Sequence, residues 1–232
     1  MHVNLERTTK LVEWVVAEAQ EFDFILLTGD IISLTQEEHG LASCAAAAEG
    51  STSSVLSALE SIQSKVIYIP GNHDHSSLFL PPPQRPHLTV FSRNIHASSI
   101  RIAHELVLLG FGGSCPATKA GEECWTGVPY ASQAAFSEAF AAAAAQWQQD
   151  VRAGDSVLLC THVGPHCSAT ATVHNFAPLD TISSGGDAVS RHIQHMQRTH
   201  PRQLLANIHG HTHDARGMCV LGRCLQYRCI KP

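Results

Sequence analysis

Long apolar runs are absent from this sequence. No stretch approaches the roughly 20 apolar residues that cross a bilayer, so we expect no transmembrane segment and no membrane partner. The stretch Met1–Arg7 has no basic region followed by an apolar one, so no secretory signal is expected. Charged residues make up only 15% of the chain, and Lys and Arg form no cluster, which argues against a nucleic-acid partner.

The sequence also lacks any C-x-x-C pair, although it contains 8 cysteines. Cys219, Cys224 and Cys229 recur at a regular spacing that fits neither a zinc knuckle nor a known disulfide framework. We therefore expect reduced core thiols and a cytoplasmic location.

The composition is typical of an ordered globular protein, with 44% hydrophobic residues and a net charge of −5 over 232 residues. We expect a single domain over residues 1–232, because there are neither repeats nor an inter-domain linker. Apolar periodicity and helix formers predict helices at 5–20, 54–63, 131–151 and 187–199. Strands are expected at 24–28, 65–69, 88–91, 100–103, 106–111, 156–160 and 204–208, with a closing pair in 218–228. Loops are expected at 33–52 (with a short helix), 112–129 and 162–186. Trp125 lies in the second of these loops and Tyr130 directly follows it; the alternatives for them are a pocket rim and packing, and packing is the expected role.

Four short polar clusters each follow one of the apolar runs. They are Gly29-Asp30, Gly71-Asn72-His73-Asp74, Thr161-His162 and Gly210-His211-Thr212-His213. A buried parallel strand reads as a nearly continuous apolar run, and ligands gather at the carboxyl ends of such strands. The sequence therefore predicts that these polar side chains meet at one edge of a sheet.

The donor set suits a pair of divalent metal ions. A dinuclear site needs a bridging carboxylate between cations about 3.5–4 Å apart, and Asp30 is the candidate. Asn72, His162, His211 and His213 offer the amide oxygen and neutral imidazoles that complete such sites. Each alone has a common structural role, such as a turn cap for Asp30 or a satisfied buried ring for His162. Their joint occurrence at four strand ends favours metal binding.

Taken together, the motifs GD, GNHD, a lone His after a strand and GHTH resemble the calcineurin-like metallophosphoesterase superfamily, over residues 2–217. The resemblance implies a four-layer α-β-β-α sandwich of two mixed β-sheets, and hydrolysis of a phosphomonoester or phosphodiester by a metal-bridging hydroxide. It implies that Asp30 bridges two divalent ions (Mn, Fe or Zn) and that His73 is the catalytic general acid. The other metal ligands that it implies are Asn72, His162 and His211 at one ion, and His213 and His2 at the other.

The start of the chain departs from the family pattern. His2 matches the His of the family's D-x-H motif, but the Asp of that motif would precede Met1, as would the first strand. Two explanations stay open: a fragment of a longer enzyme, or a defective first metal site. A mononuclear site formed by Asn72, His162 and His211 is a further alternative, as is a non-catalytic interaction scaffold on the same fold, against which His73 argues.

The segment after Asp30 lacks the V-D-R-G sequence of the protein phosphatases of the superfamily. The basic extensions of its nuclease branch are missing too. We therefore expect a small-molecule phosphate ester as substrate. The preference for mono- or diesters, the metal and the oligomeric state stay open.

Overall fold

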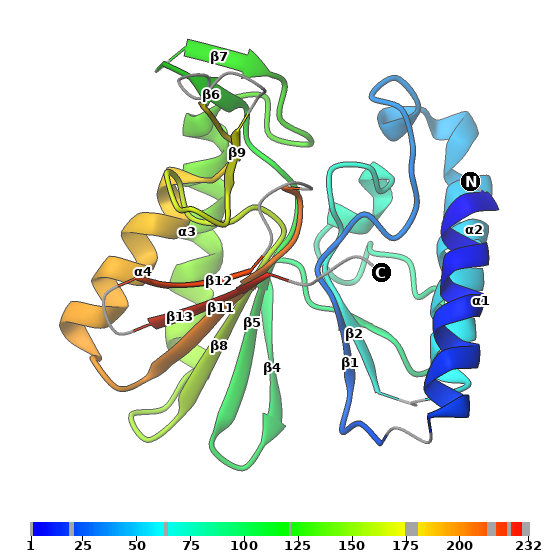
Figure 1. Ribbon diagram of the computed structural model, residues 1–232, viewed down its shortest axis with the longest axis horizontal. Helices are drawn as coiled ribbons and strands as arrows, with labels where there is room; N and C mark the ends of the chain where they lie inside the picture. The colour runs from blue at the N-terminus through cyan, green and yellow to red at the C-terminus, as the bar shows by residue number, and fades with distance from the viewer. Residues whose placement is uncertain are drawn as a thin grey trace.

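The computed structural model describes residues 2–18, 21–62, 65–120, 122–174, 181–212, 217–221 and 224–228. These residues form four layers, with two helices, a three-stranded sheet, a six-stranded sheet and two further helices following one another across the molecule (Figure 1). The predicted α-β-β-α sandwich is confirmed. The outer helices are α1 (His2–Ala17) and α2 (Ala42–Glu60) on one side, and α3 (Gln133–Asp150) and α4 (Asp187–Thr199) on the other.

The three-stranded sheet has the order β1-β2-β3, with β1 at Ile25–Leu27, β2 at Val66–Tyr68 and β3 at Arg93–Asn94. Its described strands are all parallel, which differs in detail from the expected pair of mixed sheets. Every residue of β2 is buried, as expected for a strand with a covered face on both sides. One face packs against α2 through Leu56 and Leu59, and the other faces the second sheet through Ile67.

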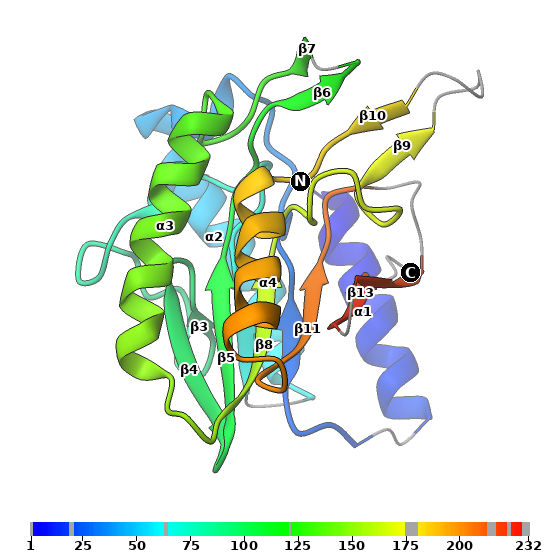
Figure 2. The same cartoon turned by 90° about the vertical axis from the view of Figure 1, so that its left-hand side faces the viewer.

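The six-stranded sheet is mixed and has the order β12-β13-β11-β8-β5-β4. The strands are β4 (Ser98–Ala103), β5 (Leu106–Phe111), β8 (Ser156–Thr161), β11 (Leu204–His209), β12 (Met218–Leu221) and β13 (Cys224–Arg228). β5, β8 and β11 run parallel to one another, so their carboxyl ends reach the same edge. Helices α3 and α4 cover the outer face (Figure 2), where Phe136, Phe140 and Trp147 of α3 form the largest core cluster with Leu159 of β8 and Ile193 of α4.

Helix α2 is longer than the sequence suggested. The expected break before residue 54 is wrong, because the helix runs through the Gly50–Ser54 stretch without interruption. Ser51, Thr52 and Ser54 each donate a side-chain hydroxyl to the carbonyl oxygen four residues earlier, at 2.9 Å. These hydroxyls are satisfied within the helix, so they do not compete for the backbone in another conformation.

The strand expected at 88–91 is also wrong, and the third strand of the sheet is β3 instead. Side chains of helix α2 hydrogen-bond to the backbone of this segment. Ser53 donates to the Leu88 carbonyl at 2.8 Å, and Glu60 accepts from the Phe91 N–H at 3.2 Å. With these groups bonded to a helix, the segment has no strand partner. Phe91 is 56% exposed.

Two segments expected to be loops carry a small antiparallel sheet of order β7-β6-β10-β9. Its strands are β6 (Ala117–Lys119), β7 (Glu122–Trp125), β9 (Thr172–His174) and β10 (Thr181–Ser183). β6 pairs with β10, so the two segments, far apart in the sequence, are joined beyond the carboxyl ends of the main strands. Figure 1 shows β6, β7 and β9 projecting past the edge of the six-stranded sheet.

The cysteines follow the expectation of core thiols in part. Cys115 and Cys160 are buried, whereas Cys124 and Cys167 are exposed. Burial raises the pKa of the Cys115 thiol to about 12, which keeps it protonated and unreactive.

Among the described residues, no helix combines the length and the apolar character needed to cross a bilayer.

Candidate metal centre

Asp30 lies in the turn that follows β1, two residues beyond Thr28. Gly29 turns the chain with a φ of 98°, and Asp30 itself has a φ of 55°, in the left-handed region that Asp tolerates better than most residues. The turn needs glycines on both sides of the site, because a Cβ on Gly29 would lie 2.4 Å from His162 Nδ1, and one on Gly71 would lie 2.2 Å from Asp30 Oδ1. The two glycines therefore allow the loops after β1 and β2 to meet around the carboxylate.

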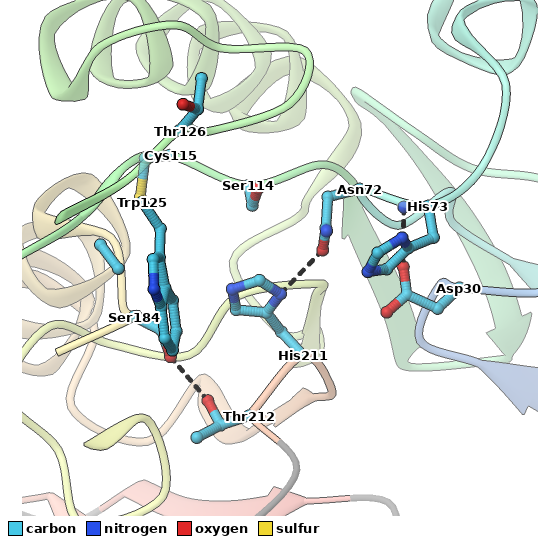
Figure 3. Close-up of a pocket in the computed structure, with 11 residues that line it drawn as sticks. Asp30, Asn72, His73, Ser114, Cys115, Trp125, Thr126, Ser184, His211 and Thr212 are labelled. Atoms are coloured by element: carbon cyan, nitrogen blue, oxygen red, sulfur yellow. Dashed lines mark hydrogen bonds between the residues drawn. The ribbon is translucent and has the colours of Figure 1, made fainter. Parts of the chain in front are cut away.

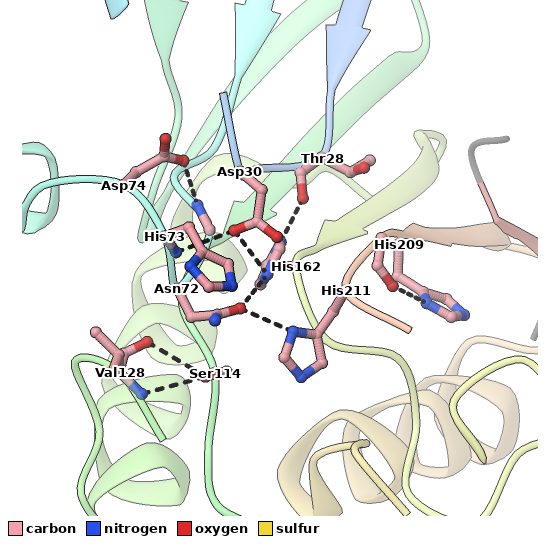
Figure 4. A network of polar contacts seen from close by, with 12 residues as sticks. Thr28, Asp30, Asn72, His73, Asp74, Ser114, Val128, His162, His209 and His211 are labelled. Atoms are coloured by element: carbon pink, nitrogen blue, oxygen red, sulfur yellow. Dashed lines mark hydrogen bonds and ion pairs between the residues drawn. The ribbon is translucent and has the colours of Figure 1, made fainter. Parts of the chain in front are cut away.

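The loop after β2 is fixed by the buried carboxylate of Asp74. Its Oδ1 accepts the Ile32 N–H at 3.0 Å and its Oδ2 accepts the Gly71 N–H at 2.7 Å, which ties the β1 and β2 loops together. The Asp30 carboxylate in turn accepts the backbone N–H of His73 at 3.0 Å. Asn72 lies between these anchors, so its side chain is held beside Asp30 (Figure 4).

The two histidines of the site come from the other sheet, where His162 follows β8 and His211 follows β11. Both approach the same atom, Asn72 Oδ1: His162 Nε2 and His211 Nδ1 each lie 2.8 Å from it. His162 Nε2 is also 3.4 Å from Asp30 Oδ1. Side chains from four strand ends and two sheets thus converge on one point, as the sequence predicted for Asp30, Asn72, His162 and His211.

The tautomer of His162 leaves a ligand atom directed at the cluster. Its Nδ1 lies 2.7 Å from the Thr28 carbonyl oxygen, which can only accept, so Nδ1 carries the proton. When the ring carries no second proton, Nε2 of His162 presents a lone pair to the oxygens of Asn72 and Asp30. Acceptors that face one another at this range repel unless a proton or a cation lies between them, and imidazole nitrogen with amide and carboxylate oxygen is a typical ligand set for divalent metals.

The spacing of these donors also fits a metal ion. Neighbouring ligands of a six-coordinate ion with bonds of about 2.1 Å lie about 3 Å apart, close to the separations around Asn72 Oδ1. Among the described residues, no three His, Cys, Asp or Glu side chains form a metal-binding group by themselves. The amide oxygen of Asn72 is therefore the donor that links Asp30 to the two imidazoles.

Two buried carboxyl groups of the site have opposite electrostatics. Burial opposes ionisation of Asp30, but the positive charge that the rings of His162, His73 and His211 carry when protonated, with the hydrogen bond from the His73 N–H, outweighs it and lowers the pKa of Asp30 below the ordinary value. Burial, together with the neighbouring Asp30 charge, raises the pKa of Asp74 to about 7. Asp30 is thus the anionic group that faces the site, and Asp74 is the carboxyl that organises the backbone behind it.

His73 lies beside the metal centre in an orientation of its own. Its Nδ1 lies 2.9 Å from the carbonyl oxygen of Leu34, so Nδ1 donates its proton there and Nε2 is directed elsewhere. The ring lines a cavity of about 360 Å³ together with Asp30, Asn72 and His211. Figure 3 shows His73, Asn72 and Asp30 on one side of this cavity and Trp125 on the other.

Sequence reasoning missed several residues around this cavity. Thr212 and Ser184, both buried, join the two far loops through hydroxyl groups 2.8 Å apart, and both line the cavity. Ser184 precedes the Gly185-Gly186 turn into α4, which was the one available signal. For Trp125 and Tyr130 the sequence favoured packing over a position at a pocket rim. Tyr130 packs as expected, stacked 5.6 Å from Phe111, but Trp125 lies in the cavity wall.

Two predicted ligands have no described side-chain position. His2 is the first residue of α1, in an outer helical layer, and only its backbone is described. His213 lies outside the described residues. Their assignment to a second metal ion stays a prediction.

Comparison with known proteins gives the family. A sequence model of the calcineurin-like phosphoesterases matches residues 1–215, and the chain belongs to that family. No curated protein sequence matches it. Ten chains of solved structures match; one crystal structure aligns with a TM-score of 0.56 and 14% identity, over 96% of this chain and 74% of its own. At that identity the likeness supports the fold alone. Enzymes of the family usually use divalent metals.

Proposed function

We propose that this protein is a metal-dependent hydrolase of small phosphate esters, in which Asp30, Asn72, His162 and His211 hold a divalent ion and His73 is the general acid. One observation carries the proposal: His162 and His211 both lie 2.8 Å from Asn72 Oδ1, beside the ionised Asp30. In this proposal, His213 and His2 are ligands of a second metal ion. Mn, Fe and Zn all suit the mixed nitrogen and oxygen ligands.

When bound, divalent ions in such a site polarise a phosphoryl oxygen and lower the pKa of bound water. The residues of the chain supply the rest. Asp30 provides the negative charge that attracts cations to the site, and its bond from the His73 N–H fixes the carboxylate. The Thr28 carbonyl keeps the proton of His162 on Nδ1, so that Nε2 stays available as a ligand.

His73 is placed to move a proton. In its protonated form, Nδ1–H donates to the Leu34 carbonyl and Nε2 carries the second proton on the cavity side. The Leu34 carbonyl therefore fixes the orientation of the ring, and Nε2–H of the protonated ring can be given to a departing alkoxide. The Leu34 N–H bonds back to the His73 carbonyl at 3.0 Å, so the two residues hold each other.

The cavity favours a small ester. Its volume of about 360 Å³ is near the lower end of ligand sites, and its described lining contains no Lys or Arg that would bind a polyanion. A small phosphomonoester or phosphodiester fits these properties better than a nucleic acid or a phosphoprotein.

The test is metal-dependent turnover of p-nitrophenyl phosphate and bis-p-nitrophenyl phosphate in the presence of Mn²⁺. Asp30→Ala and His211→Ala should abolish it, because each removes a donor from the centre. His104→Ala is the matched control, since this side chain is 95% exposed, in the turn between β4 and β5. Unchanged turnover in either site variant refutes the centre. No metal-dependent turnover in the wild-type chain favours the non-catalytic scaffold.

A further inference from the structure

Trp125 lies in the cavity wall on the β6–β7 hairpin, whose strand β6 pairs with β10. It ends β7 and pairs with Ala117 of β6, which is buried against Ile182 of β10. The ring itself stays 48% exposed, yet it lines the same cavity as Asp30, Asn72 and His73. The hairpin therefore presents an aromatic surface to the site without burying it.

Trp125 differs from the buried tryptophan of the core, Trp147. Trp147 is 1% exposed, donates its indole N–H to the Ser98 carbonyl at 3.1 Å, and packs its ring 5.4 Å from Phe140. Among the described residues, Trp125 has neither a hydrogen-bond acceptor for its N–H nor an aromatic neighbour. The face of its indole ring can therefore stack against a bound molecule, and its N–H can donate a hydrogen bond to it.

The position of the ring says which part of a substrate it would meet. Trp125 and the metal-centre side chains stand on opposite sides of the cavity, with His211 between them (Figure 3). A phosphoryl group beside Asn72 and His73 therefore directs its ester substituent across the cavity toward Trp125. The volume of about 360 Å³ leaves room for a phosphate and a compact flat group.

The described lining of the cavity offers no cation to a second anionic group. Glu122 and Glu123 lie exposed on the same strand as the tryptophan, and no Lys or Arg is among the described residues that line the cavity. Lys119 lies opposite Glu122 on β6 but is not part of the cavity lining, so a further phosphate or carboxylate in the cavity would find no cation among the described lining residues. An uncharged aromatic ring meets no such penalty and gains from stacking on indole.

We infer that Trp125 is the stacking surface for a flat aromatic group carried by the ester, so that the substrate is an aryl or nucleoside-type phosphoester. This rests on the proposed function, since the phosphoryl group must bind at the metal centre. Stacking of an aromatic group on a tryptophan is expected to raise affinity by about tenfold.

The experiment compares the binding of benzylphosphonate and cyclohexylmethylphosphonate by calorimetry with Mn²⁺ present. Both probes have a carbon–phosphorus bond that an esterase does not cleave, and they differ in whether the ring is flat and aromatic. The wild type should bind the benzyl probe about tenfold more tightly, and Trp125→Ala should reduce this ratio to about one. Trp125→Phe should keep part of it, and Trp14→Ala, which removes a 54% exposed tryptophan from α1, should keep all of it.

The outcomes separate this inference from the proposed function. Equal binding of the two probes to the wild type, or a ratio that survives in Trp125→Ala, overturns the stacking surface alone. Failure of both probes to bind the wild type overturns the proposed phosphoryl site as well. A phosphonate analogue of AMP distinguishes the sources: it binds more tightly than benzylphosphonate for a nucleoside ester and more weakly for a simple aryl ester.

Discussion

A methyl group added at Gly71 should damage both the stability and the metal centre. A Cβ at this position would lie 2.2 Å from Asp30 Oδ1, 2.3 Å from the Asp30 backbone nitrogen and 2.6 Å from His162 Cε1. The backbone nitrogen cannot move without the β1 loop, so the strain cannot be relieved by a side-chain rotation alone. The φ of Gly71 is not in the left-handed region, so the effect of Gly71→Ala is one of contact.

The magnitude follows from overpacking. An extra methyl in a closely packed site typically costs about 1–3 kcal/mol of unfolding free energy. A shift of about 1 Å in catalytic geometry can cost roughly 100-fold in rate, so metal-dependent turnover should fall by at least that factor. Urea denaturation followed by circular dichroism measures the first quantity, and hydrolysis of p-nitrophenyl phosphate measures the second.

Gly50→Ala is the matched control, because it adds the same methyl group where no heavy atom lies within 4 Å, in the middle of α2. This variant should be more stable than the wild type by about 0.5–1 kcal/mol, with unchanged turnover. If Gly71→Ala matched Gly50→Ala in stability and activity, the close contact of the β1 and β2 loops would be refuted.

Two further predictions concern histidines. His73→Ala should keep the metal content of the wild type but slow turnover by about 100-fold or more, the usual contribution of a general acid; loss of metal would show that His73 has another role. His192 lies in α4 and packs its ring against Phe140 and Trp147 of α3. Burial, with a smaller effect of His195, lowers the pKa of His192 from 6.5 to about 4. The unfolded chain therefore binds a proton that the folded protein does not, and stability is lost as the pH falls from 6.5 toward 4. His192→Leu removes this loss, so its stability relative to the wild type should rise by up to about 1.4 kcal/mol per pH unit across that window in urea titrations; parallel pH profiles would contradict the assignment.

The sequence was sufficient to predict that four polar side chains meet in the structure. Asp30, Asn72, His162 and His211 follow apolar runs that form β1, β2, β8 and β11, and strands of this kind are parallel and buried. Parallel strands bring their carboxyl ends to one edge of each sheet, and the packing of the two sheets in the structure brings these two edges together. The family resemblance supplied the four layers, which no local pattern could give.

The sequence could not decide between packing and a pocket rim for Trp125, because β7 has no buried side and therefore no apolar alternation to indicate a strand. Its partner β6 pairs with β10, more than sixty residues away, and no local signal records that contact. In α2 the opposite error arose: Gly50 and the serines after it read as a loop, but their hydroxyls bond within the helix, and tertiary packing of Val55, Leu56 and Leu59 holds it.

The most direct test of the account is the binding of Mn²⁺ to the wild type and to Asp30→Asn, measured by calorimetry and by metal analysis after dialysis. Asn keeps the shape of the side chain and removes only its charge, so a well-folded variant isolates the carboxylate. The account predicts that the wild type retains metal and that Asp30→Asn loses most of it. Equal metal content and affinity in the two proteins would contradict the claim that Asp30 and the side chains around Asn72 form a metal centre.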